Sequence, residues 1–370
     1  MKSAGIYIHV PFCQHMCNYC DYYTTEIGNA KIPKFVKMLQ REIDITASQF
    51  QYDWQFDSIY LGGGSPALLS PKTLDTILNN LQTHFSFTKS PEITLEINPG
   101  ENSLKDLQLF NTMGINRLSM GFQSLNNESL EILTRHHNQN ESDSLYKNAR
   151  TAGFTNINID MLYNIPCQTI EGLLTDLQSV VNMKPEHITL ISLTAEKGTP
   201  LYTDIEMGVL SLPHSEIESS MFEQGSQFLR EYGFSQYEVS HFAKTGMEGI
   251  HNLHYWKRDP NLAFGPSAHG FDGKIRYWNV ASLDDYFKLL SQNKLPIQNR
   301  EILTEKNILN EIIMYGLRTN FGIPSSIINK NTPEVLNKWN NCLNKQNGSI
   351  YINPQYFHLA DEIASDLMVD

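Results

Sequence analysis

The feature that most constrains the fold is an alternation of β-rich and helix-period segments along the first 205 residues. Six short runs predict strands, and they cover 5–10, 57–62, 92–97, 117–122, 156–162 and 187–193. Amphipathic segments separate these runs. Because each crossover returns the chain to the same end of the sheet, the order predicts a parallel α/β sheet. The strands look mostly apolar on both faces, as expected when helices cover a sheet.

The clearest helix is predicted after Ser70, a favourable N-cap, with Pro71 at the first helical position. Apolar residues then recur at helical spacing: Leu74, Ile77, Leu78, Leu81 and Phe85. We expect this stripe to pack on the sheet and the polar residues between its members to face water.

Periodicity leaves two parallel architectures open, a doubly wound sheet and an incomplete barrel. In a barrel, ligand-binding residues stand at the carboxyl ends of the strands. Polar residues do stand late in, or just after, four predicted strands: Glu96, Gln123, Asp160 and Thr194. This placement favours the barrel.

After about residue 205 the alternation stops, and 214–232 predicts a helix. The segment 235–280 is rich in Gly, His, Tyr and Trp and shows no long period. The end of the chain predicts a helix capped by Thr304, a helix over 333–343, a hairpin over 349–360 turning at Asn353 and Pro354, and a helix over 361–368. This outline indicates a small winged-helix-like α+β domain.

Charge and composition exclude several classes of protein. With 28 basic and 40 acidic residues the net charge is -12, and no Lys/Arg-rich run provides a nucleic-acid or anionic-membrane surface. No stretch approaches the roughly 18 apolar residues of a membrane span. The opening segment MKSAGIYIHVPFC lacks the apolar core of a secretory signal, so we expect a cytoplasmic protein.

Three of the five cysteines, Cys13, Cys17 and Cys20, form C-x3-C-x2-C directly after the first predicted strand. Three thiolates on one loop can hold three irons of a [4Fe-4S] cluster, which leaves the fourth iron open to chelate S-adenosylmethionine. The alternative is a zinc site completed by His9, His15 or Asp21, although no second ligand pair follows. Cys167 and Cys342 stand alone, and we expect both to be small buried hydrophobes.

The chain resembles the radical S-adenosylmethionine (SAM) superfamily, in its coproporphyrinogen oxidase-like branch that includes the HemW heme chaperone group. The resemblance covers nearly the whole chain through these landmarks: YIHVPFCQHMCNYCDYY (7–23), LGGGSP (61–66), LEINPGE (95–101), NRLSMGFQSLN (116–126), Arg135-x-His137, IDMLYNIPCQT (159–169), TAEKGTPLY (194–202), YEVSHFA (237–243), HNLHYW (251–256) and YGLRTNFGI (315–323). It implies a partial (β/α)6 TIM-like radical SAM barrel with a small C-terminal winged-helix-like α+β domain. The implied division is a radical SAM core (1–210), an extension with HNLHYW (211–300) and a C-terminal domain of the HemN type (301–370).

The resemblance also implies site residues. Cys13, Cys17 and Cys20 would hold the cluster, and the SAM contacts would be Tyr7, Tyr19, Gly63, Gly64, Ser65, Glu96, Gln123, Arg135, Asp160 and Thr194. Three positions depart from the family pattern: Ser65 replaces the usual threonine, and Asn164 and Cys167 stand where relatives commonly have glycine. Asparagine tolerates the left-handed region, so Asn164 need not disturb the turn.

In the HemW group, H-N-x-x-Y-W is tied to heme binding, which implies His251 as the heme ligand. His254 occupies a variable position of that motif, and His269 is a lesser candidate. Imidazole is a common axial ligand of heme iron, and aromatic rings pack on porphyrin faces.

Three functions are compatible with these features: a heme chaperone that passes heme to an acceptor protein, an oxygen-independent coproporphyrinogen III oxidase, and a zinc-stabilised binding protein. The oxidase branch has a long N-terminal extension and a further cysteine, whereas here six residues precede Tyr7 and Tyr22 takes the cysteine position. The chaperone is therefore favoured. Its expected partners are heme, an acceptor protein, an electron donor such as a flavodoxin or ferredoxin, and a membrane only peripherally through the acceptor.

Overall fold

The computed structural model describes residues 2–28, 31–50, 53–327 and 333–369. All six predicted strands are confirmed, as β1 (Lys2–Val10), β4 (Trp54–Gly63), β5 (Phe87–Ile97), β6 (Arg117–Gln123), β7 (Ile157–Tyr163) and β8 (His187–Ser192). They lie side by side in this order, and each runs parallel to the next. Because the strand order never reverses between neighbours, the arrangement is a partial barrel and not a doubly wound sheet.

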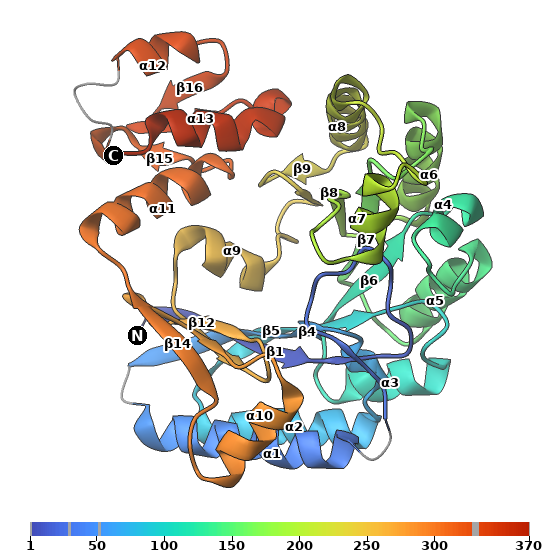
Figure 1. The fold of residues 1–370 in the computed structure, drawn as a ribbon, viewed down its shortest axis with the longest axis vertical. Helices are drawn as coiled ribbons and strands as arrows, with labels where there is room; N and C mark the ends of the chain where they lie inside the picture. The colour runs from blue at the N-terminus through green and yellow to red at the C-terminus, as the bar shows by residue number, and fades with distance from the viewer. Residues whose placement is uncertain (1, 29–30, 51–52, 328–332, 370) are drawn as a thin grey trace.

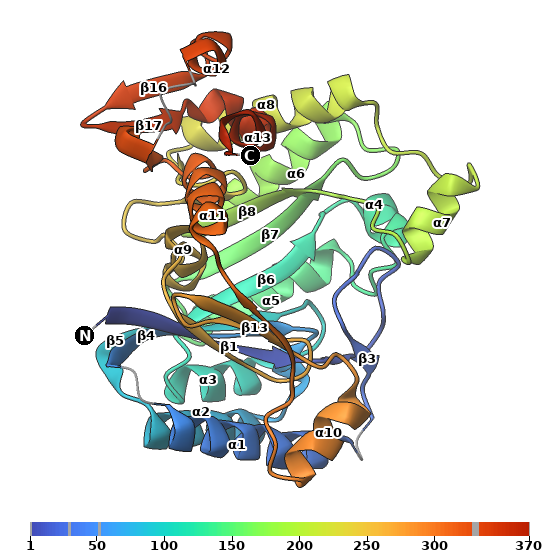
Figure 2. The same cartoon turned by 60° about the vertical axis from the view of Figure 1, so that its left-hand side comes forward.

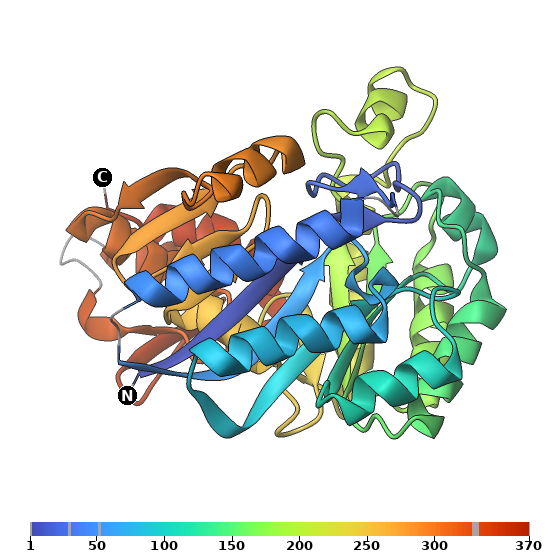
Figure 3. The ribbon, with the colours of Figure 1, turned by 90° about the horizontal axis from the view of Figure 1, so that it is seen from below.

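Helices cover the outer face of the strands (Figure 1). They are α1 (Lys31–Gln49), α2 (Pro71–His84), α3 (Leu104–Thr112), α5 (Gln139–Thr151), α6 (Ile170–Met183) and α8 (Ser215–Glu231). Seen from below, α1 (blue) and α2 (cyan) lie in front of the strands (Figure 3). The predicted start of α2 is confirmed, since the Ser70 side chain accepts a hydrogen bond from the Thr73 amide and the apolar stripe is buried.

The inner face of the barrel differs from the prediction, because it is polar and not apolar. Alternate residues of neighbouring strands carry polar side chains that are nonetheless buried: Thr94, Arg117, Ser119, Asn158, His187 and Thr189. The residues between them, such as Leu95, Leu118 and Ile159, are buried under the helices. Since side chains alternate across a strand, this pattern separates a core outside the barrel from a polar interior.

Residues 235–302, which include the segment without a long period, extend the sheet at both edges to twelve strands within the described part of the chain. β11 (Asn261–Phe264) pairs in parallel with β1, and β12 (His269–Phe271), β13 (Ile275–Asn279) and β14 (Ile297–Ile302) follow in antiparallel order. At the other edge β10 (His241–Ala243) pairs with β8 and with β9 (Ser235–Gln236). Helix α9 (Ile250–Lys257) lies on the inner side of the sheet, where it contacts β1 and β4 (Figure 1).

The extension is tied to the core by one buried carboxylate. Glu42 of α1 accepts hydrogen bonds from the Gly265 amide (2.8 Å), Asn279 Nδ2 (2.6 Å) and the Tyr286 hydroxyl (2.6 Å). Tyr286 belongs to α10 (Leu283–Ser291), so a single side chain joins β11, β13 and α10 to the barrel. Three donors satisfy the buried acid, and the extension is therefore held in a fixed position.

The C-terminal elements stack at one end of the molecule (Figure 2). They are α11 (Glu305–Leu317), β15 (Ile323–Pro324), α12 (Pro333–Lys338), β16 (Leu343–Gln346), β17 (Ser349–Ile352) and α13 (Ala360–Leu367). The Thr304 cap of α11 is confirmed. The predicted hairpin is wrong in position, because its turn is not at Asn353 and Pro354. β16 and β17 pair around Asn347 and Gly348, which both have positive φ angles, 52° and 79°. Two such residues suit a tight hairpin turn, and a 3-10 helix takes up Pro354–Leu359 instead.

Within the described ranges, none of the helices combines the length and apolarity that crossing a membrane requires.

Candidate functional site

The cysteine loop follows β1 at the carboxyl end of the strands. Cys13 ends β2 (Phe12–Cys13), which pairs with β3 (Thr25–Glu26), and the Cys20 amide donates to the Cys17 carbonyl at 3.3 Å. Burial, together with the nearby Cys20 and Cys17 thiols, raises the pKa of Cys13 to about 12. The three thiols therefore share one small, partly buried volume, in which a positive metal centre would favour their thiolate forms.

The glycine turn (Gly63–Ser65) at the end of β4 packs so closely against this loop that no side chain fits between them. The Gly64 amide donates to the Val10 carbonyl at 2.8 Å, and the Ser65 amide donates to the Phe12 carbonyl at 2.7 Å. A Cβ on Gly64 would lie 2.6 Å from the Phe12 oxygen and 3.0 Å from Cys13 Sγ. These contacts require glycine and bind the turn to the start of the cysteine loop.

Arg135 joins the cysteine loop to the ends of β5 and β6. Its Nη1 donates to Cys17 Sγ at 3.5 Å, and its Nη2 donates to Asn98 Oδ1 at 2.7 Å and to the Gly121 carbonyl at 2.8 Å. Asn98, which the sequence analysis did not single out, also donates to Ser65 Oγ at 2.8 Å. It falls within the LEINPGE landmark, one residue past the end of β5, and that position is the signal that would have identified it.

Two carboxyl groups line the polar interior next to the glycine turn. Glu96 accepts hydrogen bonds from the Tyr60 hydroxyl at 2.8 Å and the Gly63 amide at 3.1 Å. Burial raises the pKa of Glu96 to about 7, and the charge of Asp160 adds to that rise. Asp160 accepts from Ser119 Oγ (3.0 Å) and Asn158 Nδ2 (2.7 Å), so both acids are fixed acceptors for hydroxyl donors.

The remaining predicted cofactor contacts lie in different surroundings. Gln123 has a φ of 67° at the end of β6, and its Nε2 lies close to Gly121 beside Arg135. Tyr19 packs on the small apolar cluster of Leu133, Leu162, Ile165, Leu193 and Leu201, whereas Tyr7 lies deeper, with its hydroxyl 3.2 Å from His9 Nδ1. Thr194 is exposed just beyond β8. The structure thus gathers most of the predicted set, and the role of each residue remains a prediction.

The available side chains can be compared with the ligands that a [4Fe-4S] cluster needs and with those that a zinc ion needs. The residues that the structure describes include no group of three or more His, Cys, Asp or Glu side chains placed around a point where a single ion would bind. Zinc needs such convergence, whereas in a cluster each thiolate binds a different iron. His9 is engaged at both nitrogens, by the Tyr23 carbonyl at 2.8 Å and by Tyr7, so it is not a spare fourth ligand. Three thiols on one loop therefore suit the cluster.

The two departures from the glycine pattern are accommodated by backbone conformation. Asn164 and Cys167 have φ angles of 66° and 65°, the left-handed region that glycine adopts freely. The expectation that Cys167 is buried is wrong, because its side chain is exposed. Cys342 is partly buried and packs against the core, as expected of a small hydrophobe.

His251, the predicted heme ligand, lies inside the barrel and is only 1% exposed. Its Nδ1 is 3.0 Å from Ser58 Oγ and its Nε2 is 2.9 Å from the Tyr255 hydroxyl. Burial lowers the pKa of His251 to about 3, so the ring is neutral and both nitrogens have partners. In this arrangement neither nitrogen is free to bind iron.

His254 ties α9 to the barrel through two acids. Its Nε2 lies 2.6 Å from Asp57 Oδ1 and its Nδ1 lies 3.1 Å from Asp259 Oδ2. Burial alone would lower the pKa of His254, but the hydrogen bonds to Asp259 and Asp57 outweigh burial and raise it to about 9. The imidazole is therefore a cation that donates from both nitrogens and has no lone pair for a metal.

This ion triad predicts a pH-dependent stability. Because the folded pKa lies above the ordinary histidine value of 6.5, the contribution is complete below pH 6.5 and is lost as pH rises through 9. We expect the free energy of unfolding, measured by urea denaturation, to fall by about 2–3 kcal/mol across this window. The His254→Gln variant should lack this decrease. An equal decrease in both proteins would contradict the assignment.

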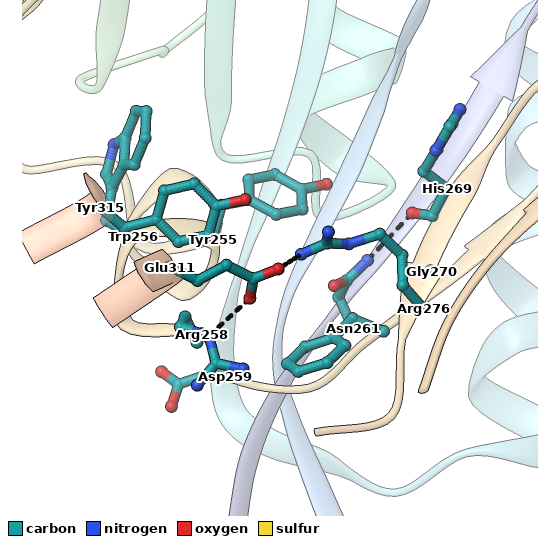
Figure 4. Close-up of a pocket in the computed structure, with 11 residues that line it drawn as sticks. Tyr255, Trp256, Arg258, Asp259, Asn261, His269, Gly270, Arg276, Glu311 and Tyr315 are labelled. Atoms are coloured by element: carbon teal, nitrogen blue, oxygen red, sulfur yellow. Dashed lines mark hydrogen bonds and ion pairs between the residues drawn. The ribbon is translucent and has the colours of Figure 1, made fainter. Parts of the chain in front are cut away.

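A cavity of about 290 Å³ opens on the inner side of the extension, between α9, β12, β13 and α11. Aromatic side chains form much of its wall: Tyr255, Trp256, Phe271 and Tyr315. Figure 4 shows Glu311 between Arg258 and Arg276, and Glu311 accepts a hydrogen bond at 2.8 Å from each. His269 also lines the cavity, toward the end away from Trp256. Glu311 offsets one of the two guanidinium charges, and an aromatic wall with the remaining positive charge suits a flat apolar molecule that carries carboxylates.

A sequential partial barrel, with three cysteines after its first strand and a glycine turn after its second, defines a radical SAM protein. The sequence model of the radical SAM superfamily matches residues 7–179. The fold of the whole chain is that of the coproporphyrinogen III oxidase HemN from Escherichia coli, with a TM-score of 0.85 at 21% identity, covering 100% of this chain and 90% of that one.

Two curated relatives are similar over most of their length. The heme chaperone HemW of Bacillus subtilis is 34% identical, with 87% of this chain and 85% of the relative aligned. The heme chaperone HemW of Lactococcus lactis is 31% identical, with 87% and 83% aligned. The chain belongs to the HemW family of the radical SAM superfamily. Membership in that superfamily implies a [4Fe-4S] cluster and SAM.

Proposed function

We propose that this protein is a heme chaperone, which binds heme and transfers it to an acceptor protein. The observation that carries the proposal is the cavity beside α9, whose wall includes Tyr255 and Trp256 of the HNLHYW motif. The similarity to the heme chaperones HemW of Bacillus subtilis and Lactococcus lactis supports the same function. Heme is a flat apolar ring that carries two propionates, and this cavity complements both features.

Unpaired donors in the cavity wall add to this argument. Among the described residues, Trp256 Nε1 and Arg258 Nη2 are buried and have no hydrogen-bond partner. Buried donors without acceptors are rare in proteins, and a carboxylate is an acceptor that such donors favour. The chemistry of the wall therefore supports an anionic ligand. A propionate is such a group.

In this proposal Cys13, Cys17 and Cys20 hold the cluster, which when bound supplies an open iron and an electron for SAM chemistry. The chain's own groups bind and orient the cofactor. Glu96 and Asp160 would accept from its hydroxyls, the Gly63–Ser65 turn would approach it with backbone atoms, and Arg135 holds the cysteine loop against the strand ends. Tyr7, Tyr19, Gln123 and Thr194 complete the proposed set.

One assay distinguishes the proposed heme chaperone from the alternative function, the oxidative decarboxylation of coproporphyrinogen III. Reconstituted protein is incubated anaerobically with coproporphyrinogen III, a reductant and SAM, and porphyrinogens are quantified by chromatography. We expect no protoporphyrinogen, because Tyr22 stands where the oxidase branch has a further cysteine. Formation of the product at many turnovers per chain would reverse the proposal.

The other expectations remain proposals of the same kind. They comprise transfer of heme to an unidentified acceptor, electron supply by a flavodoxin or ferredoxin, peripheral membrane contact through the acceptor, a cytoplasmic location, and the division into 1–210, 211–300 and 301–370. None of them involves a nucleic acid, in keeping with the net charge of -12.

A further inference from the structure

Three histidines lie at or near the heme cavity, and they differ in the state of their ring nitrogens. His251 and His254 each have both nitrogens occupied by hydrogen-bond partners. His269 differs from them, because in the described part of the chain its carbonyl accepts a hydrogen bond and its ring stacks on Trp278, but its ring nitrogens take part in no hydrogen bond or ion pair. His269 is exposed and is one of the residues that line the cavity. It is therefore the histidine whose lone pair is available to a ligand.

The β12–β13 hairpin presents His269 together with other cavity groups on one face. His269 is opposite Trp278 and Phe271 is opposite Arg276 across the two strands. The imidazole stacks on the Trp278 ring at 5.9 Å with an interplanar angle of 16°, and the Arg276 guanidinium lies over Phe271. Directly opposed side chains lie on the same face of an antiparallel pair. The hairpin thus displays an imidazole, an indole and a cation side by side.

The other face of the same hairpin is packed against the body of the protein. The Tyr277 hydroxyl accepts a hydrogen bond from the Ala263 amide at 3.3 Å, and a Cβ on Gly270 would lie 2.2 Å from the Tyr277 ring. Asn279 is held by Glu42. The backbone of His269 is fixed as well, since its carbonyl accepts from Asn261 Nδ2 at 3.2 Å. A rigid support of this kind pre-positions a metal ligand.

We infer that His269, and not His251, provides the axial nitrogen to the heme iron in this cavity, while Arg258 and Arg276 face the propionates. The inference rests on the proposed heme-binding function. Coordination needs the neutral imidazole, whose lone pair replaces a water on the ferric iron without any change of oxidation state.

The inference is tested by titrating the full-length protein with hemin and recording the Soret band, alongside the His269→Ala, His269→Tyr and His251→Ala variants. His214→Ala is the matched control, because His214 is an exposed histidine at the start of α8, away from the cavity. We expect His269→Ala to lose the histidine-ligated spectrum and to weaken hemin binding roughly tenfold or more. Added imidazole should restore the spectrum.

His269→Tyr retains an aromatic ring on Trp278 and offers phenolate oxygen as a ligand, so its spectrum should change to that of a tyrosine-ligated heme. His214→Ala and His251→Ala should retain the wild-type bands, and thermal unfolding of each variant shows whether it is folded. The inference would be overturned if His269→Ala kept the wild-type heme spectrum. It would also be overturned if folded His251→Ala were the one variant to lose the histidine-ligated spectrum. Absence of saturable hemin binding by the wild type would instead overturn the proposed function.

Discussion

Replacing Cys17 with alanine is expected to abolish the iron–sulfur cluster. After anaerobic reconstitution the wild type should contain about four iron atoms per chain, and the variant well under one. The physical reason is that Cys13, Cys17 and Cys20 are the three thiols gathered on this loop, so two remaining thiolates would leave a second iron without a protein ligand. Iron and acid-labile sulfide analysis, with the absorbance of the cluster, measures the difference.

Cys167→Ala is the control for this experiment, since Cys167 is an exposed cysteine in another loop with the same free thiol chemistry. It should retain the full iron content. Full iron in Cys17→Ala, or one tightly bound zinc in the wild type in place of iron, would contradict the cluster assignment.

Replacing Gly64 with alanine is expected to give the second large effect, on both stability and SAM binding. The added Cβ would lie 2.6 Å from the Phe12 carbonyl oxygen and 2.9 Å from that of Val10, so the backbone of the turn must move. Overpacking of this kind costs about 1–3 kcal/mol. The movement also breaks the bonds that hold the turn to the cysteine loop, and SAM affinity should fall by roughly tenfold or more, since 1.4 kcal/mol is tenfold.

Thermal unfolding and calorimetric titration with SAM measure the two effects of Gly64→Ala. Gly28→Ala is the matched control, because among the described residues a Cβ there would meet only the flexible Lys31 side chain, at 3.9 Å, and its φ is not positive. The control should behave as the wild type does. Equal SAM affinity in all three proteins would mean that the glycine turn takes no part in binding.

Much of the barrel could be predicted because its signals are local. The six strands and the capped helix α2 follow from runs and caps within a dozen residues. The polar inner face was missed because residues such as Ser119 and Asn158 occur singly between apolar neighbours. The short strands β11 to β13 lack enough residues to show a period, and pairing decides their state: β11 pairs with β1, more than 250 residues away in sequence, and β12 and β13 are added beside it.

The wrong position predicted for the C-terminal hairpin has a similar physical origin. The Asn-Pro step at 353–354 resembles a turn, but the chain also offers Asn347-Gly348, whose positive φ angles match the twist of paired strands. Proline then starts a 3-10 helix instead.

The site shows the same division between local motif and distant context. The cysteines and the glycine turn carry their function in their spacing, and the structure brings them together. A motif cannot show which nitrogen of a histidine is free. The bonds that occupy His251 come from Ser58 and Tyr255, and Ser58 lies on a strand almost 200 residues earlier in the chain.

The most direct test of the central claim is a hemin titration of the wild-type protein, followed by absorbance and by heme retained after gel filtration. A heme chaperone with the cavity described above should saturate at about one heme per chain, with a Soret band distinct from that of free hemin. Binding without saturation, or no heme retained on the protein, would contradict the account.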